Sequence, residues 1–205
     1  MIGEVGIDRT VLDWSVEHRE PWLDTVTQIV TLLGSSVLLI PLVVAVGAWY
    51  WRRHDTSRPF TLLAVTYGGS HIVSQSIKAL VGRPRPPADL IIGDYSGYAF
   101  PSGHATQAAA VYLMLAVVLA AGLPLSRHKT WVWVAAVSTV GVVGITRLYL
   151  AAHWLTDVLG GWAFGSLWCL VVLSASQAIR RDPPEARARI EGCTPSPSTP
   201  TASPN

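Results

Sequence analysis

Two histidines, an aspartate and four cations lie in three short segments of this 205-residue chain. The segment with the most informative spacing, Thr146–Asp157, contains Arg147, His153 and Asp157. If a helix begins near His153, the i, i+4 spacing lets the Asp157 carboxylate reach an imidazole nitrogen. A carboxylate there fixes the imidazole tautomer and raises its nucleophilicity. The pair is therefore a candidate nucleophile with its orienting group, and the alternative is an interfacial pair that caps a helix beside Trp154.

A second segment brings three cations together at the end of an apolar stretch. Lys78, Arg83 and Arg85 are followed or separated by prolines, which stop a helix and stiffen the chain that leaves it. Such a cluster favours the binding of an anion. The alternative is that these long side chains are anchors at a membrane interface, with their charged ends in water.

The third segment is Phe100–His104, which stands immediately before a long apolar stretch. Ser102 is a good helix N-cap, and Gly103 lets backbone amides approach a ligand closely, so the segment resembles a helix N-terminus that holds phosphate oxygens. His104 then lies on the rim of that site. A plain capping role is the alternative, and the position between two cation-rich segments favours the binding site.

A polar stripe leads up to the cations. His71, Ser74 and Gln75 fall at i, i+3 and i+4, and Lys78 follows at i+7, so the four side chains share one face of a helix. We expect this face to point into the interior of a bundle. His71 lies two turns before the cations, and we interpret it as a structural histidine.

The elements that position these segments are apolar and long. The chain is 50% hydrophobic and only 14% charged, which is typical of a membrane protein. Five uncharged windows are each long enough to cross a hydrocarbon core of about 30 Å as a helix: Thr25–Trp51, Phe60–Ile77, Ala105–Ser126, Thr130–Thr146 and Val158–Ile179. A large soluble all-α protein is the alternative, but so short a chain lacks the amphipathic helices that would cover five apolar ones.

We therefore predict an all-α fold, a multi-pass transmembrane helix bundle with about five spans and an amphipathic N-terminal helix on the membrane surface. The predicted regions are an extracytoplasmic segment 1–24, a transmembrane catalytic domain 25–181 and a disordered tail 182–205, rich in Pro, Ser and Thr. Ile7, Val11 and Trp14 recur at helical spacing in the first region. Cys169 lies in a span and Cys193 in the tail, so we expect no disulfide between them.

Charge in the short connections predicts the orientation, because Lys and Arg are retained on the cytoplasmic side. The basic connections are Arg52–Arg58, Arg127–Lys129 and the arginines after the fifth window, and alternating spans place all of them on one side. The acidic N-terminal segment and the three chemical segments fall on the other side. We expect an extracytoplasmic site and a cytoplasmic C-terminus, and cations on the outer side indicate a function because they oppose the rule.

Together the three segments resemble the type 2 phosphatidic acid phosphatase family. Its signatures are Lys-x6-Arg-Pro, Pro-Ser-Gly-His and Ser-Arg-x5-His-x3-Asp, and they match here in order from Lys78 to Asp157. Thr146 replaces the usual serine and keeps a hydroxyl group. Many bacterial members have six spans, against the five predicted here, and Arg83 lies within the x6 stretch without an assigned role.

The resemblance implies that His153 attacks phosphorus, that Asp157 orients it, and that His104 protonates the leaving oxygen. It further implies that the phosphoryl oxygens are held by Lys78, Arg85, Ser102, Gly103 and Arg147. These roles agree with the physics, because cations and amides stabilise the charge that spreads over a transferring phosphoryl group. A carboxylate-rich cluster typical of a magnesium site is absent from the sequence, so we expect neither a metal nor a cofactor.

The predicted function is hydrolysis of a lipid phosphomonoester or diphosphate at the outer membrane face, through a phosphohistidine. Polyprenyl diphosphate, phosphatidic acid and phosphatidylglycerol phosphate fit such a site equally well. The expected partners are this lipid phosphate and the bilayer, and no nucleic acid. A phosphotransferase with the same pocket remains an alternative. An anion channel would not need His153, Asp157 or His104, and the related vanadium-dependent haloperoxidases are soluble.

Overall fold

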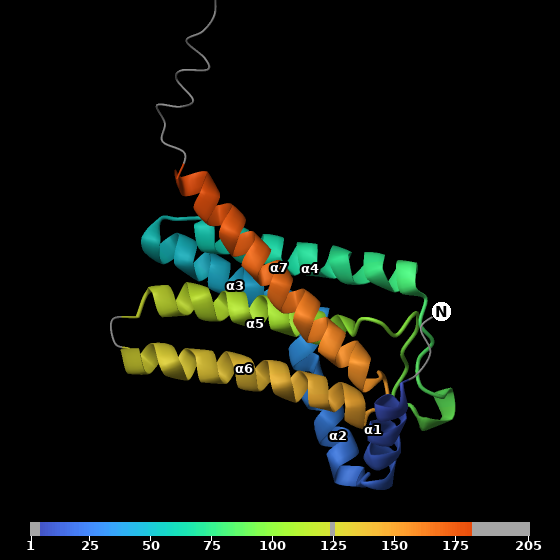
Figure 1. Ribbon diagram of the computed structural model, residues 1–205. Coiled ribbons are helices and arrows are strands. Elements are labelled where there is room, and N and C mark those ends of the chain that lie inside the picture. Colours follow the sequence, from blue (N-terminus) through green and yellow to red (C-terminus); the bar gives the residue numbers. More distant parts are fainter. Residues whose placement is uncertain (1–4, 124–125, 182–205) are drawn as a thin grey trace, which may run out of the picture.

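The computed structural model describes residues 5–123 and 126–181, and all regular elements in these ranges are helices (Figure 1). The elements are α1 (Gly6–Glu17), α2 (Pro21–Val30), the 3-10 helix η1 (Thr31–Gly34), α3 (Ser36–His54), α4 (Arg58–Val81), the 3-10 helix η2 (Ala88–Leu90), α5 (Gly103–Ala121), α6 (Ser126–Tyr149) and α7 (Leu155–Arg181). The predicted all-α class is confirmed. The predicted tail 182–205, with Cys193, lies outside the described residues.

The five long helices α3 to α7 form a bundle with α5 at its centre. Helix α5 packs against α4, α6 and α7, and its first turns, from Ala105 to Tyr112, are buried throughout. Because consecutive helices alternate in direction, α4 ends, α5 begins, α6 ends and α7 begins at one end of the bundle (Figure 1). The connection between α3 and α4, flanked by Arg52 and Arg53 in α3 and Arg58 in α4, lies at the opposite end.

Two glycines of α7 let it approach α5 at backbone distance. A Cβ atom at Gly161 would lie 2.8 Å from the Ser102 carbonyl oxygen, and one at Gly165 would lie 2.9 Å from the Ala109 Cβ and still closer to the Thr106 carbonyl oxygen. Small residues four apart are the usual means by which membrane helices pack closely. This contact holds the first turns of α5 and α7 side by side.

The first predicted window, Thr25–Trp51, is divided between two helices instead of forming a single one. Helices α2 and η1 together are bent by 44° relative to α3, and Ser35 between them has an extended backbone. Gly34, the last residue before Ser35, is closely packed, since an added Cβ would lie 2.6 Å from Val143 Cγ1 and 3.1 Å from His104 Cβ. The break therefore lies directly beside one of the candidate histidines.

The membrane character predicted from composition is found in the helices. Within residues 5–123 and 126–181, three single helices are long and apolar enough to cross a membrane, namely α5, α6 and α7, and the bent pair Pro21–Gly34 with Ser36–His54 passes the same test together. Helix α4 has 24 residues, and Thr66, Ser70 and Ser74 are buried on its inner face. This polar face lowers its hydropathy, and α4 is not among the helices that pass the test on their own.

The N-terminal residues fold back onto the end of the bundle where α6 and α7 meet. Helix α1 contacts both of them and buries Asp8, Leu12 and Ser15 against the protein. Ile7 and Trp14, in contrast, are 55% and 59% exposed. A helix is therefore present before Pro21, and its placement on a membrane surface stays a prediction.

Candidate active site

The three chemical segments meet in one cavity at the end of the bundle where α5 and α7 begin. The cavity has a volume of about 380 Å³. Six of the eight predicted site residues line it: Lys78, Arg85, Gly103, His104, Arg147 and His153. The other two, Ser102 and Asp157, are fully buried behind this lining. Residues far apart in the sequence are thus brought together as predicted.

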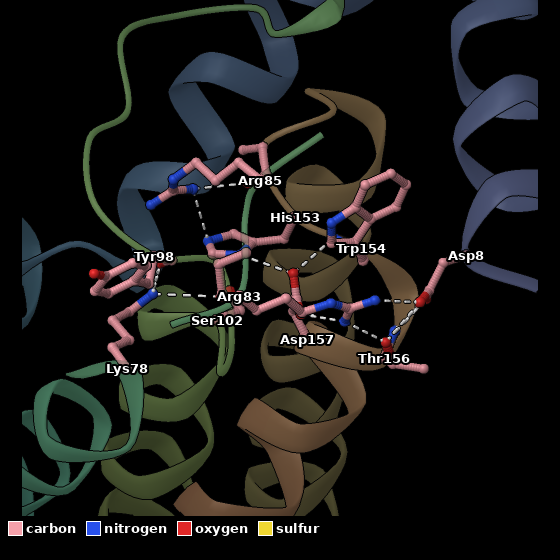
Figure 2. A network of polar contacts seen from close by, with 12 residues as sticks. Asp8, Lys78, Arg83, Arg85, Tyr98, Ser102, His153, Trp154, Thr156 and Asp157 are labelled. Atoms are coloured by element: carbon pink, nitrogen blue, oxygen red, sulfur yellow. Dashed lines mark hydrogen bonds and ion pairs between the residues drawn. The ribbon is translucent and has the colours of Figure 1, made fainter. Parts of the chain in front are cut away.

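His153 lies in the short connection between α6 and α7 and is 4% exposed. Its Nδ1 atom is 3.5 Å from Asp157 Oδ2, and its Nε2 atom is 3.3 Å from Arg85 Nη1 (Figure 2). Helix α7 begins at Leu155, so His153 precedes the helix and does not belong to its first turn. The imidazole is held between a carboxylate on one side and a guanidinium on the other.

Asp157 has several partners besides His153. Its Oδ2 atom accepts a hydrogen bond of 2.9 Å from the Trp154 amide, which is the bond that the third helical residue makes in a capping box. Its Oδ1 atom accepts one of 2.6 Å from Arg83 Nη1. This carboxylate therefore caps α7 and also faces the imidazole, so its geometry fits both interpretations drawn from the sequence, and its role in catalysis stays a prediction.

The surroundings of His153 favour its neutral form. Burial lowers the pKa of its imidazole well below the ordinary value, and the charges of Arg147, Arg85 and Lys78 lower it further. A neutral imidazole has a lone pair on one ring nitrogen. If Nδ1–H points to Asp157, that lone pair is on Nε2, the atom beside Arg85.

Three cations line the cavity, namely Lys78, Arg85 and Arg147. The first two are held mainly by backbone carbonyls of the connection between α4 and α5. Lys78 Nζ donates to the Tyr98 carbonyl oxygen at 2.5 Å (Figure 2). Arg85 donates to the carbonyl oxygens of Ser96 and Gly97, each at 3.0 Å, and to that of Ala152 at 2.7 Å. These bonds fix the direction of both side chains toward the cavity.

Arg147 is the most deeply buried cation of the lining, at 1% exposure. It lies in the last turn of α6, where the helix dipole favours a positive charge. Its Nη1 atom donates to Thr31 Oγ1 at 3.0 Å, and its guanidinium lies against the ring of Tyr95. Sequence reasoning missed Thr31 and Tyr95, because neither belongs to a spaced motif.

The first turn of α5 differs from the prediction in one respect. Ser102 is at the N-cap position, but its side chain makes no capping hydrogen bond, and its buried hydroxyl has no partner among the described residues. The Ser102 amide instead donates to the Asp157 carbonyl oxygen at 2.9 Å. Arg147 Nε and Ser74 Oγ are likewise buried without a partner in the described part of the chain. Of these three residues Arg147 lines the cavity, so an anionic ligand bound there would provide a partner for its Nε atom.

His71, interpreted from the sequence as structural, has a protein partner and also lines the cavity. Its Nδ1 atom is 2.7 Å from Gln107 Nε2, so the amide fixes the orientation of the ring. Of the other residues of the polar stripe, Ser74 is buried, Lys78 lines the cavity, and Gln75 lines it but is exposed.

Arg83, which the sequence left without a role, is 1% exposed and does not line the cavity. Figure 2 shows its guanidinium between Asp157 on one side and Asp8 with Thr156 on the other. No local pattern links Asp8 to Arg83, because the two residues are 75 positions apart. The connection between α1 and the back of the site is visible only in the folded chain.

This geometry defines a class of protein. A neutral buried imidazole, three cations and a helix N-terminus around one cavity suit an enzyme that binds and transfers a phosphoryl group, and the apolar helices place it in a membrane. Among the described residues, no three His, Cys, Asp or Glu side chains are grouped so that they could hold a metal ion.

Comparison with known proteins gives the family. The model of the PAP2 superfamily matches residues 59–181, and the chain belongs to this superfamily of membrane phosphatases. Phosphatidylglycerophosphatase B of Bacillus subtilis (strain 168) is 36% identical over 175 residues, which cover 85% of each chain. The undecaprenyl-diphosphatase of Sulfolobus acidocaldarius is 27% identical over 111 residues, 51% of this chain and 48% of that protein.

A solved structure agrees with this assignment. The crystal structure of a transmembrane PAP2 type phosphatidylglycerolphosphate phosphatase from Bacillus subtilis superposes with a TM-score of 0.80 at 35% sequence identity, over 86% of this chain and 87% of that one. The resemblance noted from three short motifs therefore extends over most of the fold.

Proposed function

We propose that this chain is a lipid phosphatase that works through a covalent phosphohistidine at His153, at the extracytoplasmic face of the membrane. The single observation that carries the proposal is the setting of His153, whose imidazole lies between Asp157 and Arg85 in a cavity lined by further cations. This setting combines a neutral nucleophile with the charges that stabilise a phosphoryl group.

In the first half of the proposed reaction, His153 Nε2 attacks phosphorus and the bond to the leaving oxygen breaks. His104, protonated once the anionic substrate is bound, gives a proton to that oxygen and becomes neutral, so the lipid alcohol or lipid phosphate departs with a hydrogen. The phosphohistidine ring carries a positive charge, which the Asp157 carboxylate stabilises. In the second half, His104 takes a proton from water, the hydroxide displaces phosphate from Nε2, and the neutral imidazole returns.

The remaining site residues hold the phosphoryl oxygens. Arg85 and Arg147 have planar guanidinium groups that can engage two oxygens each, and Lys78 acts as a point charge. We assign the same role to the amides of the first α5 turn, including that of Gly103, and to the hydroxyl of Ser102, which is buried directly behind the lining. The chemistry derived in this way needs no metal ion.

Membrane sidedness follows from charge. The site lies at the end of the bundle opposite Arg52 and Arg53 in the last turn of α3, and basic connections are retained in the cytoplasm. We propose an extracytoplasmic site, a bundle in which the bent pair and α4 to α7 provide five spans, and an N-terminal region, residues 1–24, that covers its outer surface. Trp14 and Trp22, 59% and 65% exposed, suit such an interface.

Phosphatidylglycerol phosphate is the first substrate to test, because it is the substrate named for the relative with 36% identity and for the superposed structure. Polyprenyl diphosphate and phosphatidic acid contain the same phosphoryl group next to an apolar chain and are the alternatives. The rates of phosphate release from the three lipids, measured separately, would rank them as substrates.

The experiment is phosphate release by the purified protein in detergent, with a chelator present. We expect release from at least one of the three lipids, and a loss of about a thousandfold or more in His153→Ala. His128→Ala, which removes an exposed histidine at the far end of the bundle, is the control. Full activity of His153→Ala would disprove the assignment. Loss of substrate without free phosphate, and with a phosphorylated alcohol as product, would indicate a phosphotransferase.

A further inference from the structure

Asp8 is a carboxylate that the mechanism does not use, and it is buried where burial is costly. It belongs to α1, a helix on the surface of the bundle, yet it is 1% exposed. Charged side chains are almost never fully buried unless they are paired. The partners of Asp8 therefore indicate what this residue does.

Apart from the Val5 amide at the start of its own helix, its partners lie at the back of the active site. Asp8 Oδ2 accepts a bond of 2.6 Å from Arg83 Nη2, and Asp8 Oδ1 accepts one of 2.9 Å from the Thr156 amide. Burial alone would raise the pKa of Asp8, but the bonds from the Thr156 amide, Arg83 and the Val5 amide outweigh it and lower that pKa. Asp8 is thus a charged group attached to the first turn of α7, which bears Asp157.

Arg83 joins Asp8 to Asp157. Its Nη1 atom is 2.6 Å from Asp157 Oδ1, and its Nη2 atom is 2.6 Å from Asp8 Oδ2, with both carboxylates fully covered. One guanidinium is therefore shared by two carboxylates, and with both carboxylates ionised the three side chains together carry one net negative charge. In a poorly solvated place this charge acts strongly on its neighbours.

The neighbour on the cavity side is His153, whose Nδ1 atom is 3.5 Å from Asp157 Oδ2. If Asp157 were the only partner of Arg83, the two charges would cancel, and little negative charge would face the imidazole. Asp8 prevents this cancellation because it competes for the same guanidinium. It also fixes the geometry, since Arg83 is held from both ends.

We propose that Asp8 is a positioning residue of the active site, which acts through Arg83 to orient Asp157 and to maintain negative charge behind His153. The inference rests on the proposed function, because the charge matters when the phosphohistidine forms and its ring becomes positive. It assigns to the N-terminal helix a part in catalysis that lies outside all three signature segments.

The first test is Asp8→Asn, which keeps the shape and an oxygen for the Thr156 amide while it removes the charge. We expect kcat to fall about tenfold or more, with KM and the affinity for orthovanadate within about twofold of the wild type, because Asp8 does not line the cavity. Asp13→Asn is the matched control, since Asp13 is on the same helix but its side chain is 49% exposed and pairs with Arg9. We expect no change from it.

A double-mutant cycle separates positioning from mere folding stability. Rates are divided by the number of sites that bind orthovanadate, so that unfolded protein does not count. In an Asp157→Asn background, Asp8→Asn should cause no further loss, because the group through which it acts is gone. An equal loss in both backgrounds would assign Asp8 a structural role alone and overturn the inference.

The two proposals fail in different ways. If the wild type and Asp13→Asn release no phosphate from any of the lipids, the proposed function fails. If the wild type is active and Asp8→Asn is equally active, the function stands and the positioning role is wrong.

Should Asp8→Asn not fold, Arg83→Lys takes its place, because lysine keeps the charge but cannot bridge two carboxylates as a fork. We expect the same fall in kcat, and full activity of this variant would refute the inference.

Discussion

Tyr95 lies over the guanidinium of Arg147, with the ring centroid 4.2 Å from Arg147 Cζ. The contact joins the connection between α4 and α5 to the last turn of α6, and it leaves one face of the planar group covered by an aromatic ring. Arg147 Nη1 is fixed at the same time by Thr31. The most buried cation of the cavity is therefore oriented before any phosphoryl group arrives.

Removal of this ring should weaken phosphate binding. A cation–π contact is worth about 0.5–2 kcal/mol, so we expect Tyr95→Ala to raise the Kd for orthovanadate by about two- to thirtyfold. Tyr95→Phe keeps the ring and should retain most of the affinity. Isothermal titration in detergent measures both variants, and wild-type affinity in Tyr95→Ala would show that the contact does not orient Arg147.

Substitution of His104 should depend on the leaving group. If His104 protonates the departing oxygen, His104→Gln should lower kcat for a lipid phosphate by about a hundredfold or more. A nitrophenyl phosphate, whose phenolate departs without a proton, should lose far less. His153→Ala is the comparison, since it should lose activity toward both substrates alike. Equal losses of His104→Gln on the two substrates would contradict a role in proton donation.

The buried imidazole of His153 should make stability depend on pH. Its pKa is lowered in the folded chain, so below about pH 6.5 the unfolded chain binds a proton that the folded chain does not. The free energy of unfolding contributed by this group is complete above that pH and falls as the pH drops. The midpoint of thermal unfolding should therefore decrease less between about pH 7.5 and pH 5.5 in His153→Asn than in the wild type. A steeper decrease in the variant would contradict the direction of the shift.

A side chain at Gly165 should destabilise the bundle. Its Cβ atom would approach the Thr106 carbonyl oxygen and lie 2.9 Å from Ala109 Cβ, and backbone cannot move aside as a flexible side chain can. We expect Gly165→Ala to lower the stability by about 1–3 kcal/mol, measured as a lower midpoint of thermal unfolding. Gly68→Ala is the control, because nothing lies within 4 Å of the added atom, and it should not lower the midpoint.

The sequence predicted the residues that line the cavity better than the residues that hold them in place. Lys78, Arg85, His104, Arg147 and His153 could be found because each belongs to a motif whose spacing is itself informative. The break at Ser35 could not be found, since no charge or proline marks it and Gly34 beside it packs against residues far along the chain. Uncharged windows indicate where a membrane segment lies, but they do not show whether it is one helix or two.

The supporting residues Asp8 and Arg83 were missed for a related reason. Asp8 looked like one of several acidic residues that indicate the outer side of a membrane, and only its burial distinguishes it from Asp13 on the same helix. Arg83 looked like a second copy of its neighbour Arg85, although Arg85 faces the cavity and Arg83 lies behind it. Long-range ion pairs leave no periodic pattern in a sequence, so composition and spacing cannot reveal them.

The close contact between α5 and α7 separates the chemistry of this protein from its adaptation to a lipid environment. His104 and Asp157 lie on the first turns of the two helices, and Gly161 and Gly165 of α7 pack there against the backbone and the small alanine side chains of α5. The opposite face of α7 exposes Leu167, Leu170 and Val171. Substitutions on that face can match bilayers of different thickness or fluidity, while the distance between the groups that carry out the reaction stays the same.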